Sequence, residues 1–152
     1  MSSVQLDQDI VIVAAKRTPM GRFQGELSTI ASPKLAATAI KGFMQQSGLA
    51  GEQVDEVLMG CVLPAGLGQA PARQATLGAE LPLSVGATTV NKVCGSGMKT
   101  VMLAHDLIKA GSANDVVAGG MESMSQAPYL LDKARGGMRM GHGKVLDHMF
   151  LD

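Results

Sequence analysis

One of the two cysteines, Cys94, lies between a β-branched run and a glycine-flanked apolar run, in the stretch TTVNKVCGSGMK that covers residues 88–99. A thiol at the start of a helix meets unpaired N–H groups and a partial positive charge, and both favour the reactive thiolate. Gly95 and Gly97 carry no side chains, so a carbonyl group could approach the backbone closely. The pattern is therefore compatible with a nucleophilic cysteine, beside backbone N–H groups that could bind an oxyanion during acyl transfer.

A packing role is the alternative for each cysteine, because cysteine is among the most buried residue types. Cys61 lies inside the apolar run MGCVL, and we expect it to be structural. Two cysteines are too few for a disulfide framework, and the sequence has no CxxC metal motif. We expect neither a bound metal nor a redox cofactor.

Alternating strands and helices are predicted to position Cys94. The apolar runs predict strands over residues 9–15, 54–64, 87–93 and 115–119, and helices over about 32–47, 71–80 and 97–110. The first helix begins at Ser32 as its cap, followed by a proline, and we expect one apolar side made of Leu35, Ala39, Phe43 and Gln46. This alternation is typical of an α/β domain with a parallel sheet and helical crossovers.

The helix that follows Cys94 is apolar on nearly all sides. Such a helix is typical of the centre of a larger body, so we expect it to be buried, with His105 as a satisfied core histidine. The regular alternation stops after Glu122, which could be a catalytic carboxylate or a buried hydrogen-bonded one. We expect one domain over residues 1–120 and the beginning of an irregular loop domain over 121–152.

Composition excludes several classes of function. The chain is 46% hydrophobic and only 17% charged, which indicates a globular protein with part of its surface covered by a partner subunit or by further polypeptide. Thirteen basic and thirteen acidic residues cancel, and one Tyr and three Phe are the aromatic residues, so we expect neither nucleic acid nor a membrane as partner. The polar N-terminus has no signal-peptide pattern, and we expect a soluble, cytoplasmic protein.

The stretch NKVCGSGMK, residues 91–99, resembles the acyl-accepting cysteine segment of the thiolases, the family of acetyl-CoA acetyltransferases and 3-ketoacyl-CoA thiolases. Further segments are similar to the same family: VAAKRTPMG at 13–21, MGCV at 59–62 with GQAPARQ at 68–74, GGMESMS at 119–125, and RGG at 135–137, Met140-Gly141 and Asp147 at the start of its substrate-covering loop. Ala70 departs from the asparagine that many relatives have there.

This resemblance implies a thiolase-like N-terminal half, which is a layered βαβαβ-type unit with a mainly parallel mixed sheet. Cys94 would take an acyl group from an acyl-CoA, and condensation with acetyl-CoA or the reverse thiolysis would follow. The implied substrates are CoA thioesters, and the implied assembly is a homo-oligomer. In the family, a GHP motif, a CxGGGxG motif and an asparagine complete the site; the two motifs are absent here, and His142 in GHGK is not assigned the role of the base.

Two other functions remain open at this point. One is a related condensing enzyme, such as a ketoacyl synthase that acts on carrier-protein thioesters, and the other is a non-catalytic assembly or lipid-binding unit with the same fold. Arg135, Arg139 and Lys144 could meet CoA phosphates or could be ordinary solvated charges. Because the family's second-half motifs are missing, we expect residues 1–152 alone to be inactive.

Overall fold

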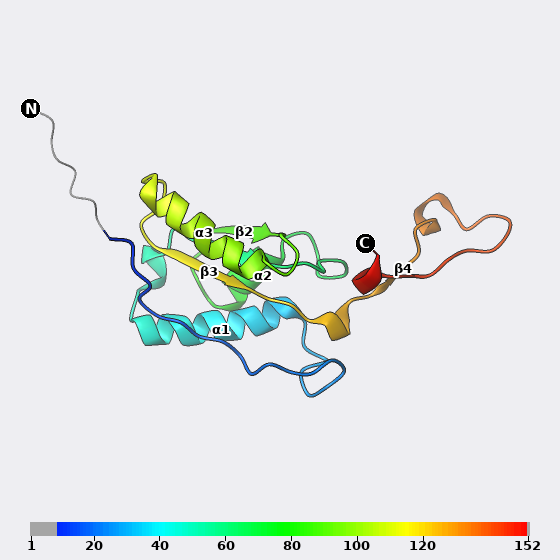
Figure 1. The fold of residues 1–152 in the computed structure, drawn as a ribbon, viewed down its shortest axis with the longest axis horizontal. Helices are drawn as coiled ribbons and strands as arrows, with labels where there is room; N and C mark the ends of the chain where they lie inside the picture. The colour runs from blue at the N-terminus through cyan, green and yellow to red at the C-terminus, as the bar shows by residue number, and fades with distance from the viewer. Residues whose placement is uncertain (1–8, 152) are drawn as a thin grey trace, which may run out of the picture.

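The computed structural model describes residues 9–151, and these residues form the α/β fold that the sequence predicts (Figure 1). Within that range, the strands β1 (Glu56–Gly60), β2 (Gly86–Val90) and β3 (Val116–Gly120) form a parallel sheet in the order β2–β1–β3. The helices α1 (Ser32–Ser47), α2 (Pro71–Gly78) and α3 (Ser96–Lys109) connect and cover it. The expectation that the chain has no signal peptide rests on the polar N-terminus. Residues 1–8 of that stretch lie outside the described residues.

The order of the strands places α2 and α3 on opposite faces of the sheet. The chain moves from β1 to its neighbour β2 through α2, and then back across β1 to β3 through α3. Because parallel crossovers are right-handed, two steps in opposite directions put their helices on opposite faces. Helix α1 packs against α2, and Figure 1 shows α1 and α3 on the two sides of the sheet.

The main hydrophobic core lies between the sheet and the layer made by α1 and α2. Strand β1 is central and covered on both faces, so its residues after Glu56 are all buried, as expected for a strand in the middle of a parallel sheet. The side chains of this core are mostly small on the helices and larger on the sheet; they include Ala36, Ala37, Ile40, Val57, Met59, Ala72 and Ala75.

Helix α1 begins near the predicted residue but buries a different side. Ser32 is its first residue, Ala31 precedes it as the cap without a side-chain hydrogen bond, and Pro33 follows in the first turn. The helix ends at Gly48, whose φ of 71° is a left-handed conformation that glycine adopts readily. The fully buried side consists of Ser32, Pro33, Ala36, Ala37 and Ile40. On the predicted side, Leu35, Ala39 and Phe43 are half-buried and Gln46 is exposed. The smaller side chains face the core because α1 packs closely on α2.

The strand predicted at residues 9–15 does not form. This segment is extended, but no backbone hydrogen bond joins it to the described part of the sheet. Val11, Ile12 and Val13 are 61–81% exposed, although a β-branched run of this kind is typical of a buried strand. The physical reason is that a hollow, and not another strand, lies between this segment and β3 within the described residues.

Helix α3 is covered on one side only, which corrects the expectation of a fully buried helix. Ser96, Thr100 and Ala104 are buried against the sheet, whereas Met98, Val101 and Met102 are 45–75% exposed. His105 is also exposed, with Nδ1 3.2 Å from Oδ1 of Asp106, so it is not a core histidine. Nothing in residues 9–151 covers the outer side of this helix, and that is why the apolar pattern is not matched by burial.

After β3 the chain has the irregular character that the sequence predicts. Short 3-10 turns alternate with a small antiparallel pair, β4 (Tyr129–Leu130) and β5 (Leu146–Asp147). Residues 123–126 lie against the loop 24–30, where Ser123 Oγ donates to the carbonyl of Ile30 over 2.8 Å. Within residues 9–151, no helix combines the length and the apolar character needed to cross a membrane.

Candidate functional site

The sheet has one point where consecutive connections leave toward opposite faces. The loop after β1 leads to α2 on one face, and the loop after β2 leads to α3 on the other. In open α/β sheets, ligands bind outside the carboxyl ends of the strands at such a point. Cys94 lies in the loop after β2, so the topology brings the sequence-predicted nucleophile to the expected position for a ligand site.

Cys94 lies in a tight turn between β2 and α3 and is exposed. Gly95 is the N-cap of α3, so the thiol precedes the first turn of a 14-residue helix, as the sequence predicts. The preceding residue, Val93, has a φ of 48°. A β-branched residue in the left-handed region is a conformational outlier, and such outliers persist where the surrounding structure enforces them.

Two polar side chains hold this turn. Ser96 Oγ accepts from the N–H of Lys92 over 2.8 Å and donates to the carbonyl of Val93 over 2.6 Å. Asn91 Oδ1 accepts from the N–H of Val93 over 2.9 Å. The predicted strand 87–93 therefore ends early, at Val90, because Asn91 and Ser96 bind the backbone groups that a longer strand would use.

Glu122 fixes the loop after β1 and is not placed near Cys94 by any contact among the described residues. Its carboxylate accepts from the N–H of Val62 over 2.8 Å and from the N–H of Leu63 over 3.3 Å. These contacts end β1 at Gly60, short of the predicted residue 64. Of the two roles that the sequence leaves open for Glu122, the structure shows the hydrogen-bonded one.

Cys61 is structural, as predicted. Its side chain is only 1% exposed, and Sγ lies 3.8 Å from Oε1 of Glu122. Burial, followed by the negative charge of Glu122, raises the pKa of the Cys61 thiol to about 11. A protonated, enclosed thiol is a poor nucleophile.

We expect the raised pKa of Cys61 to make the protein lose stability in alkali. Between its usual value of 9.0 and about 11, the thiol is ionised in the unfolded chain but protonated in the folded one. The unfolded state then binds fewer protons, so the free energy of unfolding falls as the pH rises, by ~2 kcal/mol over this interval. Urea titrations at several pH values check this, and Cys61→Ala should remove that part of the fall. An identical fall in Cys61→Ala would contradict the assignment.

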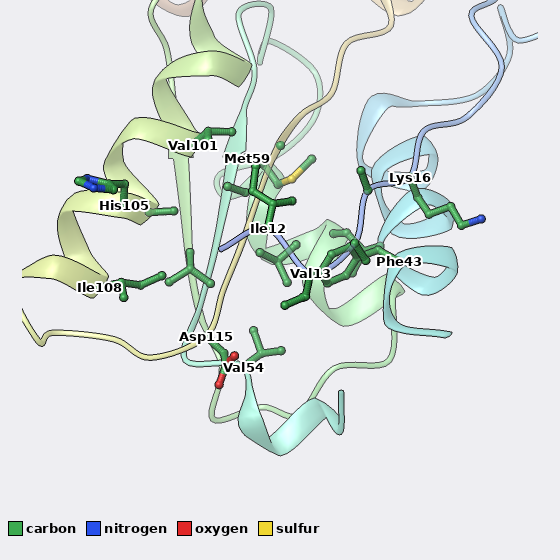
Figure 2. A pocket seen from close by; sticks show the side chains of 18 of the residues that line it. Ile12, Val13, Lys16, Phe43, Val54, Met59, Val101, His105, Ile108 and Asp115 are labelled. Atoms are coloured by element: carbon green, nitrogen blue, oxygen red, sulfur yellow. The ribbon is translucent and has the colours of Figure 1, made fainter. Parts of the chain in front are cut away.

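A large hollow lies elsewhere, between the extended segment 9–18, helices α1 and α3, and the edge of β3. It has a volume of about 1520 Å³. Figure 2 shows that Ile12, Val13, Met59 and Phe43 gather in it, whereas His105 points away. No residue from 91 to 100 lines this hollow, so it is not the space in which Cys94 could meet a substrate.

The remaining sequence-predicted candidates are not brought to Cys94. Arg135, Arg139 and Lys144 are exposed and form no ion pair among the described residues, which favours solvated charge over a phosphate site. The described part of the chain contains no group of three His, Cys, Asp or Glu side chains placed to hold a metal ion. The sequence analysis missed Asn91 and Ser96, although an asparagine two residues before a bend is a known turn signal.

Comparison with known proteins identifies the fold. Residues 10–152 match the family model for the thiolase N-terminal domain. The chain is 54% identical over 145 residues to an acetyl-CoA acetyltransferase of Pseudomonas aeruginosa and 53% identical over 146 residues to one of Escherichia coli; each match covers 95% of this chain. A mitochondrial acetyl-CoA acetyltransferase of Danio rerio is 55% identical over 135 residues, or 87% of this chain.

The chain spans 32–37% of the length of these relatives. The matched region includes the turn that carries Cys94, both loops at the carboxyl edge of the sheet, and the irregular segment after β3. The match extends over almost the whole chain and agrees with the observed fold. It includes residues 91–99, NKVCGSGMK, where the resemblance was first seen. This chain therefore belongs to the thiolase family.

Proposed function

We propose that this chain carries the acyl-accepting part of an acyl-CoA C-acetyltransferase, with Cys94 as the nucleophile. The observation that supports this most is the position of Cys94, exposed on an enforced turn at the start of α3 and at the carboxyl edge of the sheet. The names of the relatives, all acetyl-CoA acetyltransferases, support acetyl-CoA as a substrate.

In the proposed reaction, the Cys94 thiolate attacks the carbonyl carbon of an acyl-CoA thioester. The oxyanion that forms is stabilised by backbone N–H groups, among them that of Cys94. The bond between the acyl carbon and the CoA sulfur breaks, and CoA leaves with the proton that the Cys94 thiol gave up. A second acetyl-CoA then loses a methyl proton and attacks the acyl-enzyme, which forms the carbon–carbon bond of a 3-ketoacyl-CoA and frees Cys94. Thiolysis is the same sequence in reverse.

The proton transfers of this sequence need groups that the resemblance places in the GHP and CxGGGxG motifs, which residues 1–152 lack. We therefore expect a polypeptide of only these residues to form no 3-ketoacyl-CoA from acetyl-CoA, whereas the protein expressed from its complete reading frame forms it. Product analysis by mass spectrometry checks both. Turnover by residues 1–152 alone would contradict the assignment of the proton transfers to other residues.

The alternatives predict different results. A ketoacyl synthase would prefer thioesters of an acyl carrier protein to those of CoA, which parallel assays with both donors would show. A non-catalytic unit would take no acyl group from either. We also propose a cytoplasmic homo-oligomer in which residues 1–120 form the core half and 121–152 begin the loop domain. The low content of charged residues and the exposed apolar side of α3 support the association.

A further inference from the structure

Two backbone hydrogen bonds close the turn that carries Cys94, from the N–H of Gly95 to the carbonyl of Lys92 over 3.0 Å and from the N–H of Ser96 to the carbonyl of Val93 over 3.1 Å, and side chains add to them. Val93 adopts a φ of 48°, and its side chain is 56% exposed, so packing does not enforce this conformation. The residue would relax to a common backbone conformation unless hydrogen bonds hold it. Any such relaxation would change the direction in which the next residue, Cys94, points.

Asn91 makes the hydrogen bond that holds Val93 from the strand side. The N–H of Val93 donates to Oδ1 of Asn91 over 2.9 Å, which closes a turn of the kind that asparagine side chains form with the residue two positions later. On the helix side, Ser96 Oγ donates to the carbonyl of Val93 over 2.6 Å. The two peptide groups that flank Val93 are thus bound by two different side chains.

The other end of the Asn91 amide binds the neighbouring loop. Nδ2 donates to the carbonyl of Val62 over 3.4 Å. This orientation of the amide is the one that fits, because the Val93 N–H can only donate and the Val62 carbonyl can only accept. Val62 is itself fixed, since its N–H donates to Glu122 over 2.8 Å. Asn91 therefore ties the turn of Cys94 to a loop that is anchored on the end of β3.

We propose that Asn91 is a positioning residue for Cys94, which acts by holding Val93 in the left-handed conformation against the fixed loop after β1. This inference rests on the proposed function of Cys94 as the acyl acceptor. No contact joins Asn91 to the Cys94 thiol among the described residues, so its effect passes through the backbone. A glycine at position 93 adopts a positive φ without strain, and it would make the turn largely independent of Asn91.

The test is a double-mutant cycle in the protein expressed from its complete reading frame. The rate constant for alkylation of Cys94 by iodoacetamide is measured without CoA compounds, and the acetylation of Cys94 by acetyl-CoA is measured separately. Asn91→Ala should lower both rates by about 10- to 100-fold, the scale of a misplacement of about 1 Å. In a Val93→Gly background, the same Asn91→Ala change should cost less than about threefold. Asn114→Ala, at the opposite end of the sheet, is the matched control and should change neither rate.

Asn91→Ser is the conservative variant and keeps the inference testable if Asn91→Ala does not fold. A serine hydroxyl can accept from the Val93 N–H but cannot reach Val62, so Asn91→Ser should react at a rate between those of the wild type and Asn91→Ala. The inference is overturned if Asn91→Ala reacts like the wild type, if glycine at 93 does not reduce its effect, or if serine at 91 is as damaging as alanine. A wild-type protein that takes no acetyl group would instead refute the proposed function. The alkylation rates would then still test whether Asn91 positions Cys94.

Discussion

Replacing Cys94 with serine is expected to lower the rate of acyl transfer by about 10⁴-fold or more, as for other enzymes that lose their nucleophile. A serine hydroxyl is nearly as large as a thiol, but it is ionised far less readily at neutral pH. Because Cys94 is exposed, the substitution should change the free energy of unfolding by less than about 0.5 kcal/mol. Steady-state kinetics with acetyl-CoA and a urea titration of the same preparation check the two parts.

Cys61→Ala is the matched control for this experiment. It removes the other thiol of the chain, which is buried beside Glu122 and has a pKa raised by that burial. It should lower stability, because a buried side chain is shortened, but leave acyl transfer within about a few-fold of the wild type. A Cys94→Ser protein that keeps a tenth of its activity, or a Cys61→Ala protein that loses it, would be incompatible with Cys94 as the acyl acceptor.

The second large effect is expected at Gly60, where the end of β1 meets the start of α3. A Cβ on Gly60 would lie 2.7 Å from Ser96 Cβ and 2.8 Å from the backbone nitrogen of Gly97. Real Cβ contacts are not this short, and the atoms in the way belong to the backbone and first turn of the helix. Gly60→Ala must therefore push the start of α3, and Cys94 with it, away from the sheet. We expect a loss of about 3 kcal/mol in the free energy of unfolding.

Activity should fall as well, by about 100-fold, since a small displacement of a reacting group has an effect of this size. Denaturant titration and kinetics at a temperature where the variant remains folded separate the two effects. The comparison is with Gly97→Ala, whose Cβ would have its nearest neighbour at 3.7 Å, an ordinary contact. Alanine is also the better helix former by about 1 kcal/mol, so Gly97→Ala should not destabilise the protein. Equal stabilities for the two variants would show that the close packing at Gly60 is unimportant.

The alternation of strands and helices could be predicted because it follows from the period of the apolar residues. The ends of the strands could not, because hydrogen bonds from side chains set them. Glu122 binds the N–H groups of Val62 and Leu63 and so ends β1. Asn91 binds the N–H of Val93 and ends β2 in the same manner. Neither contact has a signature in the local pattern of apolar residues.

The segments at 9–15 and on α3 show a different limit of sequence reasoning. An apolar run indicates that a segment favours burial, but not which part of a polypeptide covers it. Val11, Ile12 and the outer side of α3 are apolar, yet nothing within residues 9–151 covers them. The prediction that residues 9–15 and helix α3 are buried was therefore wrong for this chain, although both segments are apolar as the sequence indicates.

Within the site, the position of Cys94 could be predicted from the sequence, but the side chains that hold its turn could not all be predicted. A cysteine between a β-branched run and a glycine-flanked helix has a recognisable sequence. The left-handed conformation of Val93 contradicts the preference of valine, so no local rule leads to it. Sequence rules are expected to fail at strained functional sites, where the fold enforces what the local sequence disfavours. Asn91 is a turn signal that the sequence does offer, whereas the role of Ser96 becomes visible only when its contacts with this turn are known.

The central claim is that Cys94 accepts the acyl group, and peptide mapping tests it most directly. The protein from the complete reading frame is mixed with acetyl-CoA, quenched in acid, digested with trypsin and analysed by mass spectrometry. Cleavage after Lys92 and Lys99 isolates the peptide VCGSGMK, which contains Cys94 as its sole cysteine. We predict that this peptide gains the mass of one acetyl group, and that the peptide with Cys61 does not. An acetyl group on Cys61, or turnover with no acetyl group on VCGSGMK, would contradict the account.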